Sequence, residues 1–239
     1  MKGGLHIHNA GFTEGTNDCT SGFVIRRWKD GSWPLAILTA GHCVAHGVNE
    51  WWEHNNLPLG KSKYQTWGST AIDGQVRSSD VGVIEIYDVN GSIPATANQL
   101  FVYNGSNHIF SIPTYIPTSN QTTGSQACAY GFNSNSSHCV TILKTNVKHS
   151  SPSWGVTHWI MNTIEYDWNL IEGDSGGPIY QQWGDDRAAM GTHVHSTSGG
   201  GSTGYGWYTP ILVGQADYNN VTTAQGNPDS FVLCMDANC

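Results

Sequence analysis

The run GDSGGP at residues 173–178 constrains the fold of this chain more than any other feature of its sequence. Two glycines and a proline directly after Ser175 oppose a helix there, because glycine is a poor helix former and proline lacks the backbone N–H. The chain also has 29 glycines among frequent Ser, Thr and Asn residues, and no long stretch has a helical apolar period. This pattern is typical of short strands joined by turns, so we expect an all-β fold.

Two upstream runs supply what a serine nucleophile requires. The run TAGHC at residues 39–43 contains His42, and the run SDVGVI at residues 79–84 places Asp80 at the entry to an apolar strand. A serine hydroxyl needs a base, and a histidine base needs a carboxylate to orient it. We therefore predict a catalytic triad of His42, Asp80 and Ser175.

An oxyanion hole is predicted in the same glycine-rich run. Its donors are the backbone N–H groups of Gly173 and Ser175, and a glycine leaves room for the substrate and tolerates unusual dihedrals. His42 must be neutral to accept the serine proton, so we expect activity to fall in mild acid. Asp73 is a rival for the triad carboxylate, but its sequence context indicates a turn.

These motifs, together with the opening Gly3-Gly4 and the run CTSGF at residues 19–23, resemble those of the chymotrypsin-like serine peptidases. The similarity is greatest to the secreted bacterial branch with α-lytic protease, the streptogrisins and the glutamyl endopeptidases. The resemblance implies two packed six-stranded antiparallel β-barrels with the site between them. It also implies peptide hydrolysis through an acyl-enzyme at Ser175, without a cofactor.

The expected organisation is a single peptidase unit spanning residues 1–239. A turn-rich connection suggests an N-terminal barrel over residues 1–105, which contains His42 and Asp80, and a C-terminal barrel over residues 106–239, which contains Ser175. We also expect a short C-terminal helix at residues 230–236.

Two other classes of function remain as alternatives. The run also fits G-x-S-x-G, the nucleophile elbow of α/β-hydrolase esterases, with Asp185 or Asp186 and then His193 or His195 following the serine. The absence of a helix signal after the serine disfavours that fold. The second alternative is an inactive peptidase homologue that acts as a binding module, although none of the three triad residues is lost.

The resemblance also places the walls of a substrate pocket. Asn169, where trypsin-like enzymes keep an aspartate, disfavours cleavage after Arg or Lys. His193 falls where glutamyl endopeptidases place a histidine, which favours Glu or Asp before the cut. Glu172 would repel an acidic substrate, so a hydrophobic or mixed preference stays open. The predicted substrate-binding residues are Asn169, Glu172, His193, His195, Ser196 and Tyr208.

Two further features concern charge and metal binding near this pocket. His193 and His195 stand two apart, so on a regular strand they share a face, but no third ligand is evident and we expect no metal. Asp174 is implied to be buried and to need a cationic partner, yet Ala129 stands where related bacterial enzymes often keep an arginine. Tyr130 or backbone amides could serve instead.

The cysteines indicate an extracellular protein. Six cysteines without a C-x-x-C pair favour disulfides over zinc, and proximity suggests one of the fifteen possible pairings. The expected bridges are Cys19–Cys43, Cys128–Cys139 and Cys234–Cys239. A formal net charge of −8 argues against nucleic-acid binding, and no apolar run is long enough to span a membrane. No signal peptide is visible, so we expect any secretion signal to have stood upstream of Met1. We expect the chain to be secreted, to be a monomer and to act on polypeptides.

Overall fold

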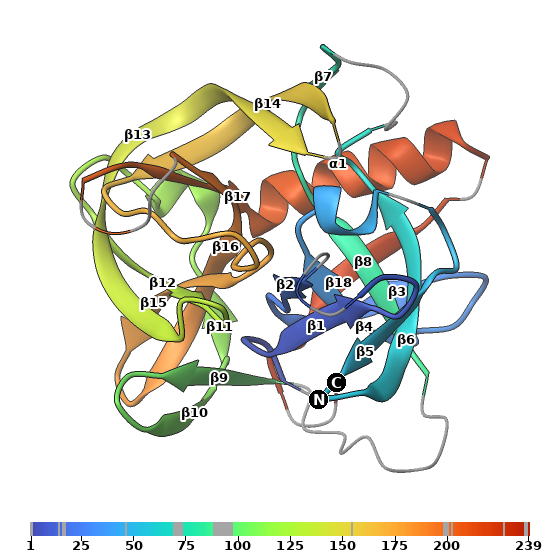
Figure 1. Cartoon of the computed structure of the whole chain (residues 1–239), viewed down its shortest axis with the longest axis horizontal. Coiled ribbons are helices and arrows are strands. Elements are labelled where there is room, and N and C mark those ends of the chain that lie inside the picture. The colour runs from blue at the N-terminus through green and yellow to red at the C-terminus, as the bar shows by residue number, and fades with distance from the viewer. Residues whose placement is uncertain are drawn as a thin grey trace.

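Two β-rich halves lie side by side in the computed structural model, with one α-helix that contacts strands of both halves (Figure 1). The structure describes residues 2–13, 15, 18–45, 47–68, 74–87, 98–153, 155–197, 201, 203–226, 228–236 and 239. Asp73, the rival carboxylate, lies outside the described residues. The all-β expectation is confirmed, since almost every element is a strand.

The elements follow the order of the chain. The helices are η1 (His42–Val44), η2 (Thr118–Asn120) and α1 (Ile211–Ala224). The strands of the first part of the chain are β1 (His6–Asn9), β2 (Asp18–Thr20), β3 (Val24–Trp28), β4 (Leu35–Thr39), β5 (Trp51–His54), β6 (Leu57–Gln65), β7 (Val76–Arg77), β8 (Gly82–Ile86), β9 (Gln99–Tyr103) and β10 (Asn107–Ser111). The later strands are β11 (Thr114–Tyr115), β12 (Gln126–Gly131), β13 (Ser136–Ser153), β14 (Val156–Tyr166), β15 (Pro178–Trp183), β16 (Asp186–Ser196), β17 (Gly206–Pro210) and β18 (Ser230–Leu233).

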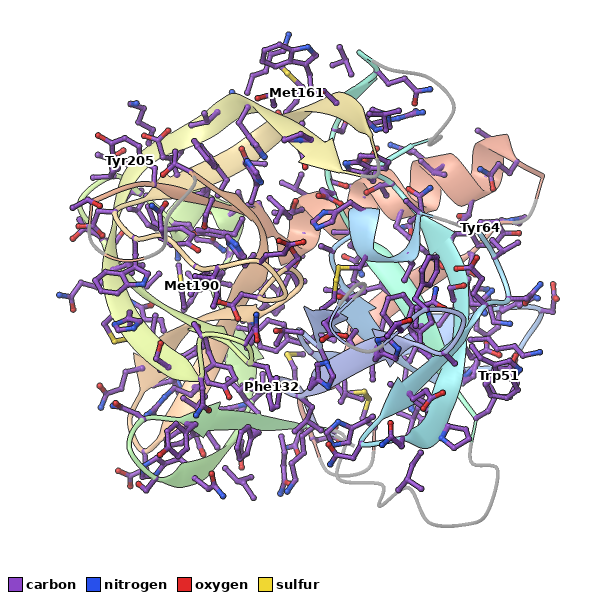
Figure 2. All side chains as sticks on the ribbon, in the orientation of Figure 1. Trp51, Tyr64, Phe132, Met161, Met190 and Tyr205 are labelled. Atoms are coloured by element: carbon purple, nitrogen blue, oxygen red, sulfur yellow. A yellow bond between two sulfur atoms is a disulfide. The ribbon has the colours of Figure 1, made fainter. Side chains whose placement is uncertain are left out.

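The second half is a closed six-stranded barrel. Its strands follow the order β16-β15-β12-β13-β14-β17, and β17 pairs with β16 to close the ring. Alternate residues of these strands point inward and form one apolar cluster, which includes Ile142, Ile179 and Met190. Figure 2 shows Met190 within this barrel.

The first half is a curled sheet and not the closed six-stranded barrel that we expected. Its order is β18-β3-β4-β8-β6-β5-β1-β2, and the two end strands, β18 and β2, have no ladder between them among the described residues. The hairpin between β3 and β4 turns at Asp30 and Gly31, which both have positive φ (47° and 83°), as the sequence KDGS predicts. The sheet adds strands from both ends of the chain, which a sequence-local pattern does not reveal.

The C-terminal helix is not where we expected it. Residues 211–224 form α1, whereas Ser230–Leu233 forms β18, which pairs antiparallel with β3. The reason is alternation, since Phe231 is fully buried and Val232 is exposed. Arg27 of β3 is buried as well, and it forms ion pairs with Glu85 and with Asp229 next to β18. No helix within the described part of the chain is long and apolar enough to cross a membrane.

Two segments cross between the halves. The C-terminal strand β18 joins the first sheet, while β7, which lies early in the chain, pairs in parallel with β14 of the barrel. The division of the chain at residues 105 and 106 stays a prediction, and these crossings tie the two halves together.

All three expected disulfides are present. Cys19–Cys43 joins β2 to η1 with a Cα–Cα distance of 6.4 Å. Cys128–Cys139 links facing residues of β12 and β13, and Cys234–Cys239 closes the C-terminal end. The pairing by sequence proximity is therefore confirmed.

Candidate active site

The carboxylate of Asp80 holds both the backbone and the ring of His42. Its Oδ2 lies 2.7 Å from His42 Nδ1, and its Oδ1 accepts a hydrogen bond of 2.8 Å from the backbone N–H of His42. Asp80 is fully buried and its own N–H donates to Thr209 Oγ1 of β17. A neutral imidazole in this setting carries its proton on Nδ1, so its lone pair is on Nε2.

The loop that carries Ser175 packs against the strand and the disulfide beside His42. The Ser175 carbonyl accepts from the Thr20 N–H (2.8 Å), and Cys43 Sγ lies 3.8 Å from the same carbonyl oxygen. Gly173 has a φ of +90°, which an L side chain rarely adopts, and its carbonyl accepts from Thr20 Oγ1. Since Cys43 follows His42 in the chain, these contacts bring the three predicted triad residues to one junction between the halves.

The two predicted oxyanion donors are available for a ligand. Among the described residues, no hydrogen bond uses the backbone N–H of Gly173 or of Ser175. Two unpaired donors on one tight loop are suited to a developing negative charge on a carbonyl oxygen.

Backbone amides hold Asp174, the residue for which no cationic partner was evident. Its Oδ1 accepts from the Ser134 N–H (2.9 Å) and its Oδ2 from the Ile171 N–H (3.0 Å). A Cβ at Gly131 would lie 2.0 Å from the Asp174 carboxyl carbon, so glycine is required there for the carboxylate to fit. Burial raises the pKa of Asp174, and the backbone hydrogen bonds oppose that rise.

His193 is buried beneath the nucleophile loop and is bound by Tyr166. Its carbonyl accepts from the Gly176 N–H, and its Nδ1 lies 2.8 Å from the Tyr166 hydroxyl. Burial is the main reason that the pKa of His193 lies well below its usual value, and the nearby rings of His195 and His42 lower it further. The ring is therefore neutral at neutral pH.

The ladder between β16 and β17 shifts register between His193 and His195, so the regular strand assumed for a shared face is interrupted there. His193 contacts Tyr166, whereas His195 stacks on Trp207, with ring centroids 5.9 Å apart. His149 of β13 extends this stack, at 4.9 Å from the Trp207 ring. Burial lowers the pKa of both His149 and His195 to about 4. Among the described residues no group of three His, Cys, Asp or Glu side chains is arranged to bind a metal.

The other predicted pocket residues lie at different depths. Ser196 Oγ lies 3.4 Å from His193 Nε2 and accepts from the Leu170 N–H. Asn169 is buried and its Oδ1 accepts from Thr197, whereas Glu172 is exposed to solvent. Tyr208 is fully buried in the barrel.

The geometry also decides between the two enzyme folds that were considered. Ser175 is followed by strand β15, not by a helix, and the sheets are not of the alternating α/β kind. The α/β-hydrolase alternative is therefore wrong. A closed six-stranded barrel and a curled sheet, with one C-terminal helix, constitute the chymotrypsin-like fold.

Solved structures of known proteins support this fold. No family model and no curated protein matches the sequence. A glutamic acid specific serine protease, described as using a histidine triad in substrate binding, superposes with a TM-score of 0.66 at 21% identity, over 98% of this chain and 100% of the other. A Nocardiopsis protease superposes with a TM-score of 0.62 at 18% identity (96% and 97% covered), and Thermobifida fusca protease A with 0.62 at 20% (98% of each chain).

Sequence reasoning missed Tyr166, His149 and Trp67, all of which lie around the site. Tyr166 reaches His193 across β14 and β17, and His149 reaches Trp207 from β13. Trp67 lies edge-on to His42, with ring centroids 6.5 Å apart. None of the three lies in a recognisable motif, so no local signal could have identified them.

Proposed function

We propose that this chain is a serine endopeptidase in which Ser175 attacks the scissile carbonyl, His42 transfers the proton and Asp80 orients His42. The observation that carries the proposal is the two-oxygen contact of Asp80 with His42 beside a glycine-rich serine loop. Asp80 then stabilises the imidazolium that forms as Ser175 loses its proton. The N–H groups of Gly173 and Ser175 would bind the oxyanion of the tetrahedral intermediate.

The proposed specificity is for Glu or Asp before the cut. The pKa of Tyr166 is raised well above its usual value by burial, so its hydroxyl stays protonated and is able to donate to His193 Nδ1, which lies 2.8 Å away. In that tautomer the proton of His193 is on Nε2, which lies 3.4 Å from Ser196 Oγ, and the ring also has a hydrogen bond to the Trp207 backbone. Ser196 Oγ accepts from the Leu170 N–H, so its own hydrogen can be donated. These two donors suit a substrate carboxylate.

Two observations bear on the competing preferences. Glu172, which would oppose an acidic substrate, is exposed, so solvent screens its charge. One structure of similar fold belongs to a glutamic acid specific serine protease that is described as using a histidine triad. In this chain His193 bonds to a tyrosine instead, so a hydrophobic or mixed preference remains the second candidate.

The proposal includes an extracellular setting, polypeptide substrates and a monomer. Three disulfides in a chain of this length favour an oxidising compartment. The low content of Lys and Arg, ten residues in all, gives no basic footprint for a nucleic acid.

The test is cleavage of an unbiased peptide mixture, read by mass spectrometry, with Ser175→Ala as the matched control. Cuts that vanish in the variant support the peptidase, and cuts after Glu support the acidic pocket. Cuts after apolar residues would keep the peptidase and reject that pocket. A fluorophosphonate probe provides the second readout, because only an activated Ser175 is labelled. Without cuts and without labelling, the chain is a binding module and not a peptidase.

A further inference from the structure

A long hairpin of the barrel crosses to the first half of the molecule. Strands β13 and β14 pair along their length as far as Ser153 and Val156, and beyond the barrel wall β14 meets β7. The Trp159 N–H donates to the Gln75 carbonyl, and the Gly74 N–H donates to the Thr157 carbonyl, both at 2.7 Å. Figure 1 shows this hairpin arching over the molecule to β7. We call β13 and β14 together the bridging hairpin.

The bridging hairpin places His158 on a tryptophan of the first half. His158 is fully buried, and its ring stacks on the Trp67 indole with centroids 3.8 Å apart and an interplanar angle of 27°. Its Nδ1 lies 2.7 Å from the Trp67 carbonyl oxygen. A carbonyl only accepts, so Nδ1 carries the proton and donates. Met161 lies on the outer part of the same hairpin (Figure 2).

Trp67 in turn packs against the predicted base. Its ring lies edge-on to His42, with centroids 6.5 Å apart and an interplanar angle of 64°. A Cβ at Gly41 would lie 3.0 Å from Trp67 Cβ and 2.8 Å from Asp80 Oδ1, so Gly41 allows all three groups to meet. Trp67 is fully buried, and so is Asp80.

Thr66, which precedes Trp67, is hydrogen-bonded to the two residues that flank Asp80 in the chain. The Thr66 N–H donates to the Val81 carbonyl, and the Val81 N–H donates to Thr66 Oγ1, both at 2.8 Å. Thr66 Oγ1 also lies 2.7 Å from Ser79 Oγ. Any displacement of the segment at Trp67 is therefore transmitted to Asp80.

The orientation of the indole depends on packing. Trp67 Nε1 is buried and has no hydrogen-bond partner among the described residues, so no hydrogen bond to the indole nitrogen determines its rotation. The His158 ring covers one face of the indole, and Ile160 and Ala45 belong to the same apolar cluster. Loss of the His158 ring would leave the indole free to turn against His42.

We propose that His158 is a positioning residue, which holds Trp67 against His42 and Asp80 from the opposite half of the molecule. The bridging hairpin thereby makes alignment of the base depend on docking of the two halves. This inference rests on the proposed peptidase function and adds to it a residue that does not contact the substrate. Small displacements of catalytic groups are costly, since a misplacement of about 1 Å can reduce the rate by about 100-fold.

The test compares His158→Ala and His158→Phe with a matched control, His138→Ala. His138 also lies on the bridging hairpin and stacks on a tryptophan, Trp168, with centroids 3.9 Å apart, but it is not packed on Trp67. We expect His158→Ala to lower kcat by about 10-fold to 100-fold with little change in KM. His158→Phe keeps a ring on the indole, so its kcat should be intermediate. His138→Ala should keep the wild-type kcat.

Two further measurements separate positioning from loss of fold. Titration with a fluorophosphonate counts competent sites, and a kcat loss that this count explains entirely would overturn the inference. The low-field proton resonance of His42 Nδ1–H reports the bond to Asp80 without turnover, and it should shift or broaden in His158→Ala but not in His138→Ala. If His158→Ala does not fold, His158→Phe is compared in the same way.

The outcomes distinguish this inference from the proposed function. An active wild type with unchanged kcat and unchanged resonance in both His158 variants overturns the positioning role alone. An inactive, unlabelled wild type overturns the peptidase, and the resonance then still decides whether His158 aligns His42.

Discussion

The Tyr166 hydroxyl oxygen lies 2.8 Å from Nδ1 of His193, within hydrogen-bond distance. Burial keeps the phenol protonated, and when its hydroxyl donates to Nδ1 the proton of His193 is on Nε2. The aromatic rings of Tyr166 and Tyr208 lie 6.2 Å apart, and the Tyr208 hydroxyl donates to Gln121 Oε1. The barrel interior thus supports the predicted pocket histidine from behind.

Replacement of His193 tests the proposed acidic pocket. His193→Ala removes the Nε2–H donor, so cleavage after Glu should fall by about 10-fold to 100-fold, as expected for a hydrogen bond to a charged group. Cleavage after an apolar residue should change much less. The measurement is kcat/KM for two peptides that differ only in the residue before the cut. Equal losses for both peptides would contradict the acidic pocket.

Replacement of Tyr166 tests the tautomer of His193. Tyr166→Phe removes the hydroxyl but keeps the ring in the barrel, so Nδ1 can take the proton and Nε2 no longer always donates. We expect kcat/KM for a Glu peptide to fall by about 10-fold, with little change for the matching Gln peptide. Tyr180→Phe is the control, because the Tyr180 hydroxyl contacts Ser137 instead. If both variants behave alike, Tyr166 does not act through His193.

Asp174 should be needed for stability without a cationic partner. The two carboxylate oxygens of Asp174 accept from the backbone N–H groups of Ser134 and Ile171. An asparagine side chain has only one oxygen, so it could accept from only one of these two groups. We expect Asp174→Asn to lower the free energy of unfolding by about 1–3 kcal/mol. Urea unfolding in the Ser175→Ala background, which prevents self-digestion, measures this change. A variant as stable as its parent would show that the amides do not require the carboxylate.

The buried histidines should make the fold sensitive to acid. Burial lowers the pKa of His149 to about 4 from an ordinary value of 6.5. As pH falls below 6.5, His149 binds a proton in the unfolded chain, whereas in the folded chain it does so only near pH 4. The free energy of unfolding therefore decreases through this window, by on the order of 3 kcal/mol for His149. His195 contributes in the same direction.

The measurement is urea unfolding at several pH values for Ser175→Ala with and without His149→Phe. Phenylalanine keeps a flat ring against Trp207 but binds no proton, so the variant should lose less stability between neutral pH and pH 4. Asp174 acts in the opposite direction because its pKa is raised, but it does so equally in both proteins. Identical slopes in the two proteins would contradict the assignment to His149.

The disulfides should differ in how much each one stabilises the folded protein. Cys19–Cys43 closes a sequence separation of 24, and loop entropy assigns it roughly 3.5 kcal/mol. Cys234–Cys239 closes a separation of 5, for roughly 2 kcal/mol. Paired Cys→Ser variants, compared by unfolding, should follow this order. Only loss of Cys19–Cys43 should also lower kcat, because Cys43 adjoins His42 and contacts the Ser175 carbonyl.

Much of the fold was predictable because its signals are local. Frequent glycines and the lack of a helical apolar period indicated strands joined by turns, and one such turn forms at Asp30 and Gly31 between β3 and β4. The helix was missed because residues 211–224 contain Gly214, Asn and β-branched residues, which are weak helix formers. Gly214 lies there because a Cβ would be 2.6 Å from Val81 Cγ2, a contact that tertiary packing imposes.

The sequence by itself determined which residue types could perform the chemistry: a serine on a glycine-rich turn, a histidine and an aspartate. Short motifs record those requirements because neighbouring residues shape each turn. The tertiary structure alone decided which side chains support them. Three such contacts join distant segments of the chain. Backbone amides contact Asp174, Tyr166 contacts His193, and His158 stacks on Trp67 beside His42. Packing between β-strands creates such contacts, and no periodicity in the chain encodes them.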